Sequence, residues 1–181
     1  GGDNDGLTIY GQSGTRLFGV ECIVDAACIV SNWGRDGMRV SGGAGGLKFD
    51  NNTQLNGRDG LRVDDVLAAI VNREVFLGPN FSSDANTGGI GVNLLANSTI
   101  VFKADGAWTV GNGFGFVVAA AQNAGSVHQW IGGKIYSNSF SGVVWSGGNL
   151  MVVGNDIHKT CTNNAAGAMH EGYRHNFCDT E

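Results

Sequence analysis

A short glycine motif recurs along the whole chain and constrains the fold more than any other feature. Residues 5–9 read DGLTI, and residues 36–40 (DGMRV) and 59–63 (DGLRV) repeat that pattern closely. Looser copies, the last of them decayed, occur at residues 89–92, 115–118, 142–145 and 167–169. Successive motif glycines are 31, 23, 29, 26, 27 and 25 residues apart. A nearly constant period of this length predicts a stacked repeat architecture.

Each copy of the motif predicts one short strand with one buried face. Its glycine is followed by two apolar residues one position apart, and a period of two places both side chains on the same face of a strand. The expected inward pairs are Leu7/Ile9, Met38/Val40, Leu61/Val63, Ile90/Val92, Phe116/Val118 and Val143/Trp145. The residues between them are expected to face outward: Thr8, Arg39, Arg62, Gly91, Val117 and Val144. No long apolar stripe of period 3.6 is present, so few helices are expected.

Three short strands fit within a repeat of this length, and stacked repeats of that kind form an all-β parallel β-helix, or solenoid. We expect about six coils of 23–31 residues over residues 1–164, and a decayed terminal coil or a C-terminal tail over 165–181. The chain starts in the middle of the pattern and without a methionine, which predicts a piece of a longer protein with coils before residue 1.

Asparagines that follow apolar runs are expected at the corners between strands. Asparagine tolerates a left-handed backbone and can bond to nearby backbone groups, and stacked asparagines can bond to one another in a ladder. The residues expected in this role are Asn32, Asn52, Asn72, Asn138 and Asn155.

The coil period and the turn residues together resemble the right-handed parallel β-helix proteins of the pectate-lyase-like type, which include bacteriophage tailspikes. The resemblance covers residues 5–160 and carries no catalytic signature. It implies a right-handed coil and a parallel homotrimer. It also implies a bacterial surface glycan, capsule or O-antigen, as the partner. The protein would then be made in the host cytoplasm and act at the virion tail.

Composition excludes several classes of partner. The net charge is −5 and only 15% of residues are charged, so no basic patch can follow a nucleic-acid backbone. No apolar run has transmembrane length, and no membrane insertion is expected. Cys22, Cys28, Cys161 and Cys178 lack the paired spacing of zinc ligands, so neither a metal nor a cofactor is expected. We expect Cys22 and Cys28 to be buried thiols, whereas Cys161 and Cys178 could form a disulfide only in an oxidising compartment.

Carboxylates in neighbouring coils are the candidates for catalysis. Glycoside hydrolysis generally uses two carboxyl groups that flank the scissile bond. The candidates are Asp36, Asp59, Asp64, Asp65 and Glu74. For each of them a turn role is the alternative, most clearly for an aspartate that precedes a glycine.

Arg39 and Arg62 are the candidates for binding an anionic substrate. They recur at the same motif position, so their strands should lie about 4.8 Å apart and their charges should repel unless anions lie nearby. Two hypotheses follow: local neutralisation by aspartates, or a surface that grips an acidic sugar, since arginine matches carboxylate geometry. Trp33 lies beside them at a turn and could stack on a sugar ring. His128 and His170 are expected at the surface.

Three functions remain open. The leading hypothesis is a tailspike-like protein that binds, and as a glycoside hydrolase depolymerises, a bacterial surface polysaccharide. The second is a non-enzymatic receptor-binding or structural β-helix segment. The third is a polysaccharide lyase or epimerase on the same fold. The outward Val117 and Val144 favour burial against another copy of the chain, in the trimer that the resemblance implies, and cover by a loop of the same chain, such as residues 119–125, is the alternative.

Overall fold

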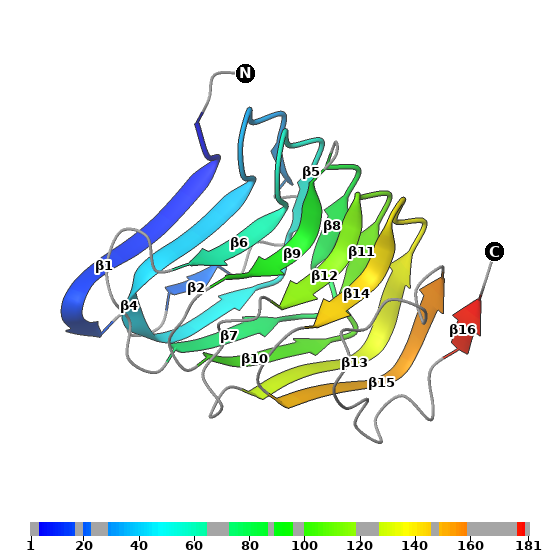
Figure 1. Cartoon of the computed structure of the whole chain (residues 1–181). Coiled ribbons are helices and arrows are strands. Elements are labelled where there is room, and N and C mark those ends of the chain that lie inside the picture. The colour runs from blue at the N-terminus through cyan, green and yellow to red at the C-terminus, as the bar shows by residue number, and fades with distance from the viewer. Residues whose placement is uncertain are drawn as a thin grey trace.

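A computed structural model describes residues 4–16, 20–22, 29–64, 73–86, 89–95, 100–118, 127–145, 149–158 and 177–179. Within these residues the regular structure is entirely strand, as the sequence predicts. All strand pairs are parallel, and the strands stack into a β-solenoid (Figure 1).

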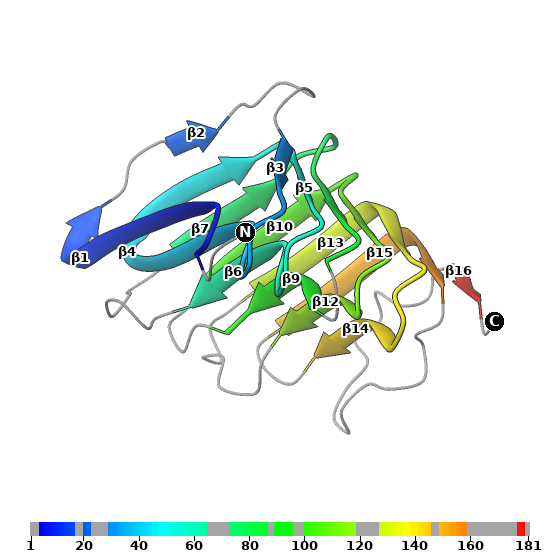
Figure 2. The same ribbon diagram turned by 90° about the horizontal axis from the view of Figure 1, so that it is seen from above.

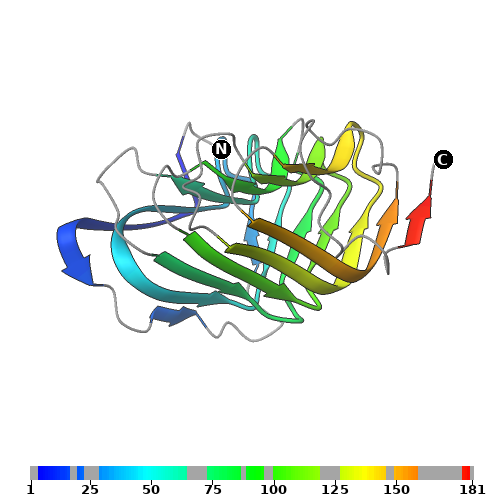
Figure 3. The same ribbon diagram turned by 60° about the horizontal axis from the view of Figure 1, so that its bottom comes forward.

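The solenoid has three faces, each a stack of parallel strands. The first face contains β1 (Leu7–Arg16), the start of β4 (Met38–Phe49), β6 (Leu61–Asp64), β9 (Ile90–Leu94), β12 (Phe114–Val118) and β14 (Ser141–Trp145). The second contains β2 (Val20–Cys22), the end of β4, β7 (Arg73–Leu77), β10 (Ile100–Asp105), and the starts of β13 (Val127–Tyr136) and β15 (Asn149–His158). Figure 3 shows this second row from below.

The third face is built from shorter strands. It contains β3 (Ile29–Ser31), β5 (Asn52–Gln54), β8 (Ser82–Asp84), β11 (Trp108–Val110), the ends of β13 and β15, and β16 (Phe177–Asp179). Seen from above, β1 and β16 lie at opposite ends of the solenoid (Figure 2).

The expected coil number requires a correction. The predicted form, three separate short strands per coil, is found in about three turns rather than six: β1–β2–β3, β6–β7–β8 and β9–β10–β11. Elsewhere β4, β13 and β15 each cover two faces as one continuous strand. In β13 the bend falls at Gly132 and Gly133, whose φ angles of 52° and 156° are accessible to glycine.

The inward columns of the first face are confirmed for the described side chains except at one turn, and the side chain of Trp145 falls outside the described part of the structure. Met38, Leu61, Phe116 and Val143 are buried in register, and Leu7 packs against them at the edge. In β9, however, Leu61 lies opposite Val92 and Val63 lies opposite Leu94. The expected pair Ile90/Val92 is therefore wrong by two residues, and the buried pair is Val92/Leu94. The outward position belongs to Asn93 and not to Gly91.

Only glycine fits at the motif position, because the backbone at the start of each first-face strand passes too close to the third face to leave room for a side chain. A Cβ atom on Gly37 would lie 2.1 Å from Thr53 Oγ1 and 3.0 Å from the Gly60 carbonyl oxygen, and one on Gly60 would lie 2.0 Å from Ser83 Oγ. Gly91 continues this stack toward Gly115, so Gly91 and not Gly89 is the structural equivalent.

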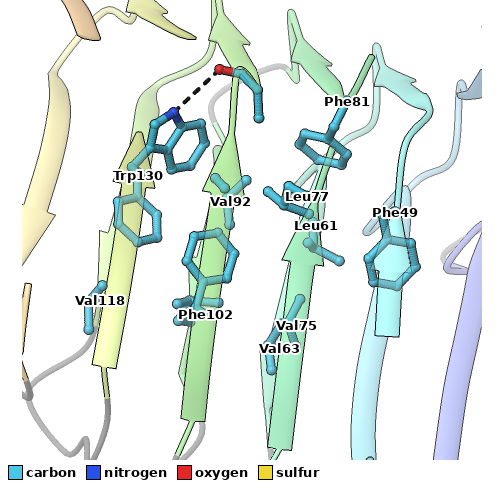
Figure 4. Close-up of a cluster of buried hydrophobic side chains, with 14 of the residues drawn as sticks. Phe49, Leu61, Val63, Val75, Leu77, Phe81, Val92, Phe102, Val118 and Trp130 are labelled. Carbon is cyan, nitrogen blue, oxygen red and sulfur yellow. Dashed lines mark hydrogen bonds between the residues drawn. The ribbon is translucent and has the colours of Figure 1, made fainter. Parts of the chain in front are cut away.

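The core between the faces contains a cluster of aromatic rings (Figure 4). Phe102 and Phe116 stack with centroids 5.2 Å apart, and the Trp130 ring lies 5.0 Å from Phe116. The Trp130 indole N–H donates to the Ala107 carbonyl at 3.3 Å, which satisfies its polar group inside the core. His128, expected at the surface, is instead buried, on the inward column of the second face beside Phe102.

Two columns of residues form the corner between the third and first faces. The first column has a left-handed backbone and contains Asn32, Leu55, Ala85, Gly111 and Ser137. The second column immediately follows it and is an asparagine ladder. Asn56 Nδ2 donates to Asn86 Oδ1 at 2.9 Å, Asn86 to Asn112 at 2.8 Å, and Asn112 to Asn138 at 3.2 Å.

The ladder is therefore confirmed in kind but was assigned to the wrong residues. Of the four expected asparagines that the structure describes, only Asn138 is a member. Asn32 is exposed one position earlier, and Asn52 lies within β5. Asn155 lies within β15, and Asn72 falls outside the described residues.

Candidate functional site

The outward side of the first face carries a network of aspartates and arginines. Thr8, Arg39, Arg62 and Asn93 lie opposite one another on successive strands. The stacked position of Arg39 and Arg62 is thus as the motif predicts. Before β1, β4 and β6, an aspartate directly precedes the motif glycine, and these aspartates form a second column: Asp5, Asp36 and Asp59.

The aspartate column binds backbone N–H groups of successive coils. Asp5 Oδ1 accepts from the Asp36 N–H at 3.3 Å, and Asp36 Oδ1 accepts from the Asp59 N–H at 3.3 Å. Asp59 Oδ1 continues the series by accepting from the Ile90 N–H at 3.1 Å. These carboxylates therefore help to align the coils at the point where each first-face strand begins.

Asp64 lies between the two stacked guanidiniums. It accepts two bonds from Arg39, at 3.1 and 3.2 Å, and one from Arg62 Nε at 2.8 Å. Arg62 also contacts Asp59 at 3.3 Å and Asp36 at 4.0 Å. This is the arrangement expected from the neutralisation hypothesis, because the anions between the arginines relieve their repulsion.

A second pair of arginines lies on the outer side of the network. Arg58 forms a two-pronged contact with Asp36, with Nε at 2.7 Å from Oδ1 and Nη2 bound to Oδ2. Arg35 Nε lies 3.7 Å from Asp5 Oδ1. The Arg35 and Arg58 side chains are 40% and 37% exposed, whereas no aspartate side chain of the network exceeds 8%. The solvent side of the network is thus cationic although its total charge is balanced.

Two groups in the network have shifted pKa values. Burial raises the pKa of the Asp59 carboxyl above its ordinary value of 3.8, and the neighbouring Asp36 charge acts in the same direction. Hydrogen bonds from Asn93 and the Ile90 N–H and the charge of Arg62 oppose that shift. The hydrogen bond to Asp36 raises the pKa of Arg58.

The structure brings most of the sequence-predicted site residues together. Asp36, Asp59, Asp64, Arg39 and Arg62 all belong to the network, although the three carboxylates are buried. The remaining candidates do not join them. Glu74 is exposed on β7, on the second face, Trp33 lies 39% exposed at the corner, and Asp65 falls outside the described residues.

Asn93 is a network residue that the sequence does not reveal. Its side-chain amide donates to Asp59 Oδ2 at 2.8 Å. The predicted register of β9, which is wrong by two residues, placed Gly91 and not Asn93 beside Arg62. Aligning Val92/Leu94 with Leu61/Val63 would have placed an amide directly beside Arg62.

A second candidate surface lies on the third face. Trp108, 38% exposed, lies opposite Lys134 in the next coil, and the Lys134 ammonium is 4.8 Å from the centre of the indole. Tyr136 meets Trp108 edge to face at 6.4 Å. Ser82 and Asp84 lie in register beside this group on β8. The sequence does not show which way the Trp108 side chain points, because a three-residue strand has too little periodicity.

Comparison with known proteins finds no matching family model, no matching curated protein and no matching solved structure. Across the described ranges, no group of three or more His, Cys, Asp or Glu side chains is arranged to hold a metal ion. The same residues include no helix long and apolar enough to span a membrane. The fold and the two surfaces define the chain as an all-strand parallel β-solenoid, a scaffold compatible with binding a polysaccharide or with a structural role.

Proposed function

We propose that this protein binds a bacterial surface polysaccharide, as part of a phage tailspike-like assembly. The observation that carries the proposal is the exposed aromatic group on the third face: Trp108 and Tyr136, with Lys134 between them. The flat face of an indole matches the C–H face of a pyranose, and hydroxyl, carboxylate and ammonium groups beside it can bond to sugar hydroxyls.

The repeating scaffold supports a polymeric ligand. Parallel strands of the third face place side chains at a regular spacing of about 4.8 Å along the solenoid axis. A row of polar and aromatic outward residues is therefore paired in register across β5, β8, β11 and β13: Asn52, Ser82, Trp108 and Lys134. A long chain of sugars can contact several coils in succession along such a row.

The experiment is a binding titration of purified capsule and O-antigen polysaccharides against the protein and a Trp108→Ala variant. We expect Trp108→Ala to weaken binding about tenfold or more while the melting temperature changes little, because the indole is partly solvent-exposed. Phe140→Ala is the matched control, since Phe140 is an exposed aromatic residue at another place. Equal binding by the wild type and Trp108→Ala would contradict the proposal.

Hydrolysis of the bound glycan is a second candidate, favoured by the raised pKa of Asp59 beside Asp36. A carboxyl whose pKa is raised can act as a general acid beside a second carboxyl group. Burial of both carboxylates favours binding over cleavage as the leading function. Release of reducing ends without unsaturated sugars, by the wild type and not by Asp59→Asn, would establish hydrolysis, whereas reducing ends accompanied by unsaturated sugars would indicate the lyase alternative.

We also propose that the assembly is a parallel homotrimer at the virion tail. Val117 and Val144 lie opposite each other in the outward column of the first face, and both are half-buried. Residues 119–121, which the sequence adds to this apolar region, fall outside the described residues.

A further inference from the structure

We infer that Trp33, Arg35 and Arg58 form a second subsite, which binds an acidic group of the ligand. The inference rests on the proposed glycan-binding function and adds the chemical class of the glycan. It concerns the corner between the third and first faces, and not the aromatic group on the third face itself.

The three residues are held in register by the backbone. The Gly57 N–H donates to the Trp33 carbonyl at 2.7 Å, and the Arg58 N–H donates to the Arg35 carbonyl at 3.0 Å. Arg58 therefore lies one coil beyond Arg35. The Trp33 N–H donates to Asn56 Oδ1 at 3.2 Å, so the asparagine ladder fixes the tryptophan. These bonds preorganise the subsite.

The indole of Trp33 is positioned as a platform. Its Cδ1 and Nε1 atoms lie 2.6 Å from the place that a Cβ atom on Gly6 would take, so this edge rests against backbone. The residue nevertheless remains 39% exposed. A sugar ring can therefore stack on it without any movement of the core.

Among the described residues, both guanidiniums keep donors without a partner. An arginine has five N–H donors, and the bonds of Arg58 within this part of the structure are those of Nε and Nη2 to Asp36. In the described part of the chain, Asp5 is the only carboxylate near Arg35, and it lies at 3.7 Å, beyond a good hydrogen bond. Two exposed cations one coil apart, each with donors to spare, suit a carboxylate or a sulfate.

The charge distribution selects an acidic sugar rather than a polyanion. The aspartates that balance the arginines are buried beneath them, so an approaching ligand meets the cations first. The chain as a whole carries a net charge of −5, which repels a densely charged polymer. An isolated acidic group next to an apolar sugar face fits both the arginines and Trp33.

The test uses a trisaccharide with a single uronic acid residue, a trisaccharide with a single sulfate group, and a carboxyl-reduced form of the first, each titrated by NMR against the wild-type chain. We expect Arg35→Gln to weaken binding of at least one charged probe about tenfold, and Arg35→Lys to weaken it less. The carboxyl-reduced probe should bind with equal strength to the wild type and Arg35→Gln. Arg35 is the chosen position because Arg58→Gln would leave buried Asp36 without its partner and could unfold the chain.

Lys103→Gln is the charge-matched control, because it removes one exposed cation from the second face. Unchanged binding of both charged probes to Arg35→Gln would overturn the inference, as would an equal loss in Lys103→Gln. Failure of the proposed function is distinguishable, since it appears as unchanged polysaccharide binding by Trp108→Ala. Arg35-dependent binding of either charged probe supports the inference, and the comparison of the two shows which acid the site prefers.

Discussion

At the scale of single residues, the corner after the third face imposes the largest backbone cost. Five successive coils place a residue there with φ between 47° and 66°, and only one of the five is glycine. A left-handed backbone costs an L-residue about 1–2 kcal/mol, least for asparagine. Leu55 and Ala85 lack the side-chain chemistry that lowers this cost for asparagine. The stacking of the coils therefore holds them in the left-handed conformation.

Leu55→Gly is therefore expected to stabilise the protein. Glycine relieves the left-handed strain, and Leu55 is half-exposed, so little burial is lost. The gain should reach up to about 1 kcal/mol in urea denaturation, because the entropy of glycine in the unfolded chain offsets part of it. Gln54→Gly, one position earlier in β5, is the control and should lower stability by about 0.5–1 kcal/mol. If the Leu55→Gly variant is no more stable than the wild type, the left-handed backbone at Leu55 does not cost the predicted free energy.

At the scale of elements, the asparagine ladder joins the third and first faces of successive coils. Asn86 lies in its middle: its side chain donates to Asn112 at 2.8 Å and to Ser83 at 3.0 Å. It also accepts from the backbone and side chain of Asn56, at 3.1 and 2.9 Å. Every one of these groups is buried, so none can turn to water instead.

Asn86→Ala should consequently destabilise the chain by about 2–4 kcal/mol, since it leaves several buried groups unsatisfied. Asn52→Ala is the matched control, because Asn52 Oδ1 accepts no hydrogen bond within the described structure. That change should cost less than about 1 kcal/mol in the same thermal unfolding experiment. Similar losses of stability in both variants would contradict a specific contribution of the ladder hydrogen bonds to the free energy of unfolding.

The aspartate column predicts a pH dependence. Because the pKa of Asp59 is raised in the folded state, the folded chain holds this proton more tightly than the unfolded chain. Its contribution to stability is therefore present below the ordinary pKa of 3.8 and is lost as the pH rises through the higher folded value. The stability of Asp59→Asn relative to the wild type should thus increase as the pH rises from about 4 toward neutrality. Urea denaturation across this range measures it, and a constant difference would contradict the shift.

At the scale of the whole molecule, the proposed trimer predicts self-association through the first face. Light scattering at micromolar concentration should give about three times the mass of one chain. Val117→Ser combined with Val144→Ser should shift the mass toward the monomer, because both valines lie in the outward column. The same double change at Val110 and Ile131, on other surfaces, is the control. A clean monomer for the wild type would count against the interface.

The amino-acid sequence is sufficient to predict the fold class, because a glycine and two alternating apolar residues recur at coil length and can be buried only by stacking. It also placed Arg39 and Arg62 opposite each other, since the closely matching motifs at 36–40 and 59–63 share one register. Both inferences depend on local periodicity, which a single sequence displays directly.

The register of β9, the members of the asparagine ladder and the partners of the arginines became clear only from the packing of the folded chain. A turn of variable length precedes each motif, so Gly89 and Gly91 look equivalent until the space beside Ser83 and Thr109 selects Gly91. Asn56 and Asn52 are likewise distinguished only by which side chain points toward the next coil. Burial of Asp64 between Arg39 and Arg62, and exposure of Arg35 and Arg58, depend on contacts between coils 20 or more residues apart, and local sequence carries no record of such contacts.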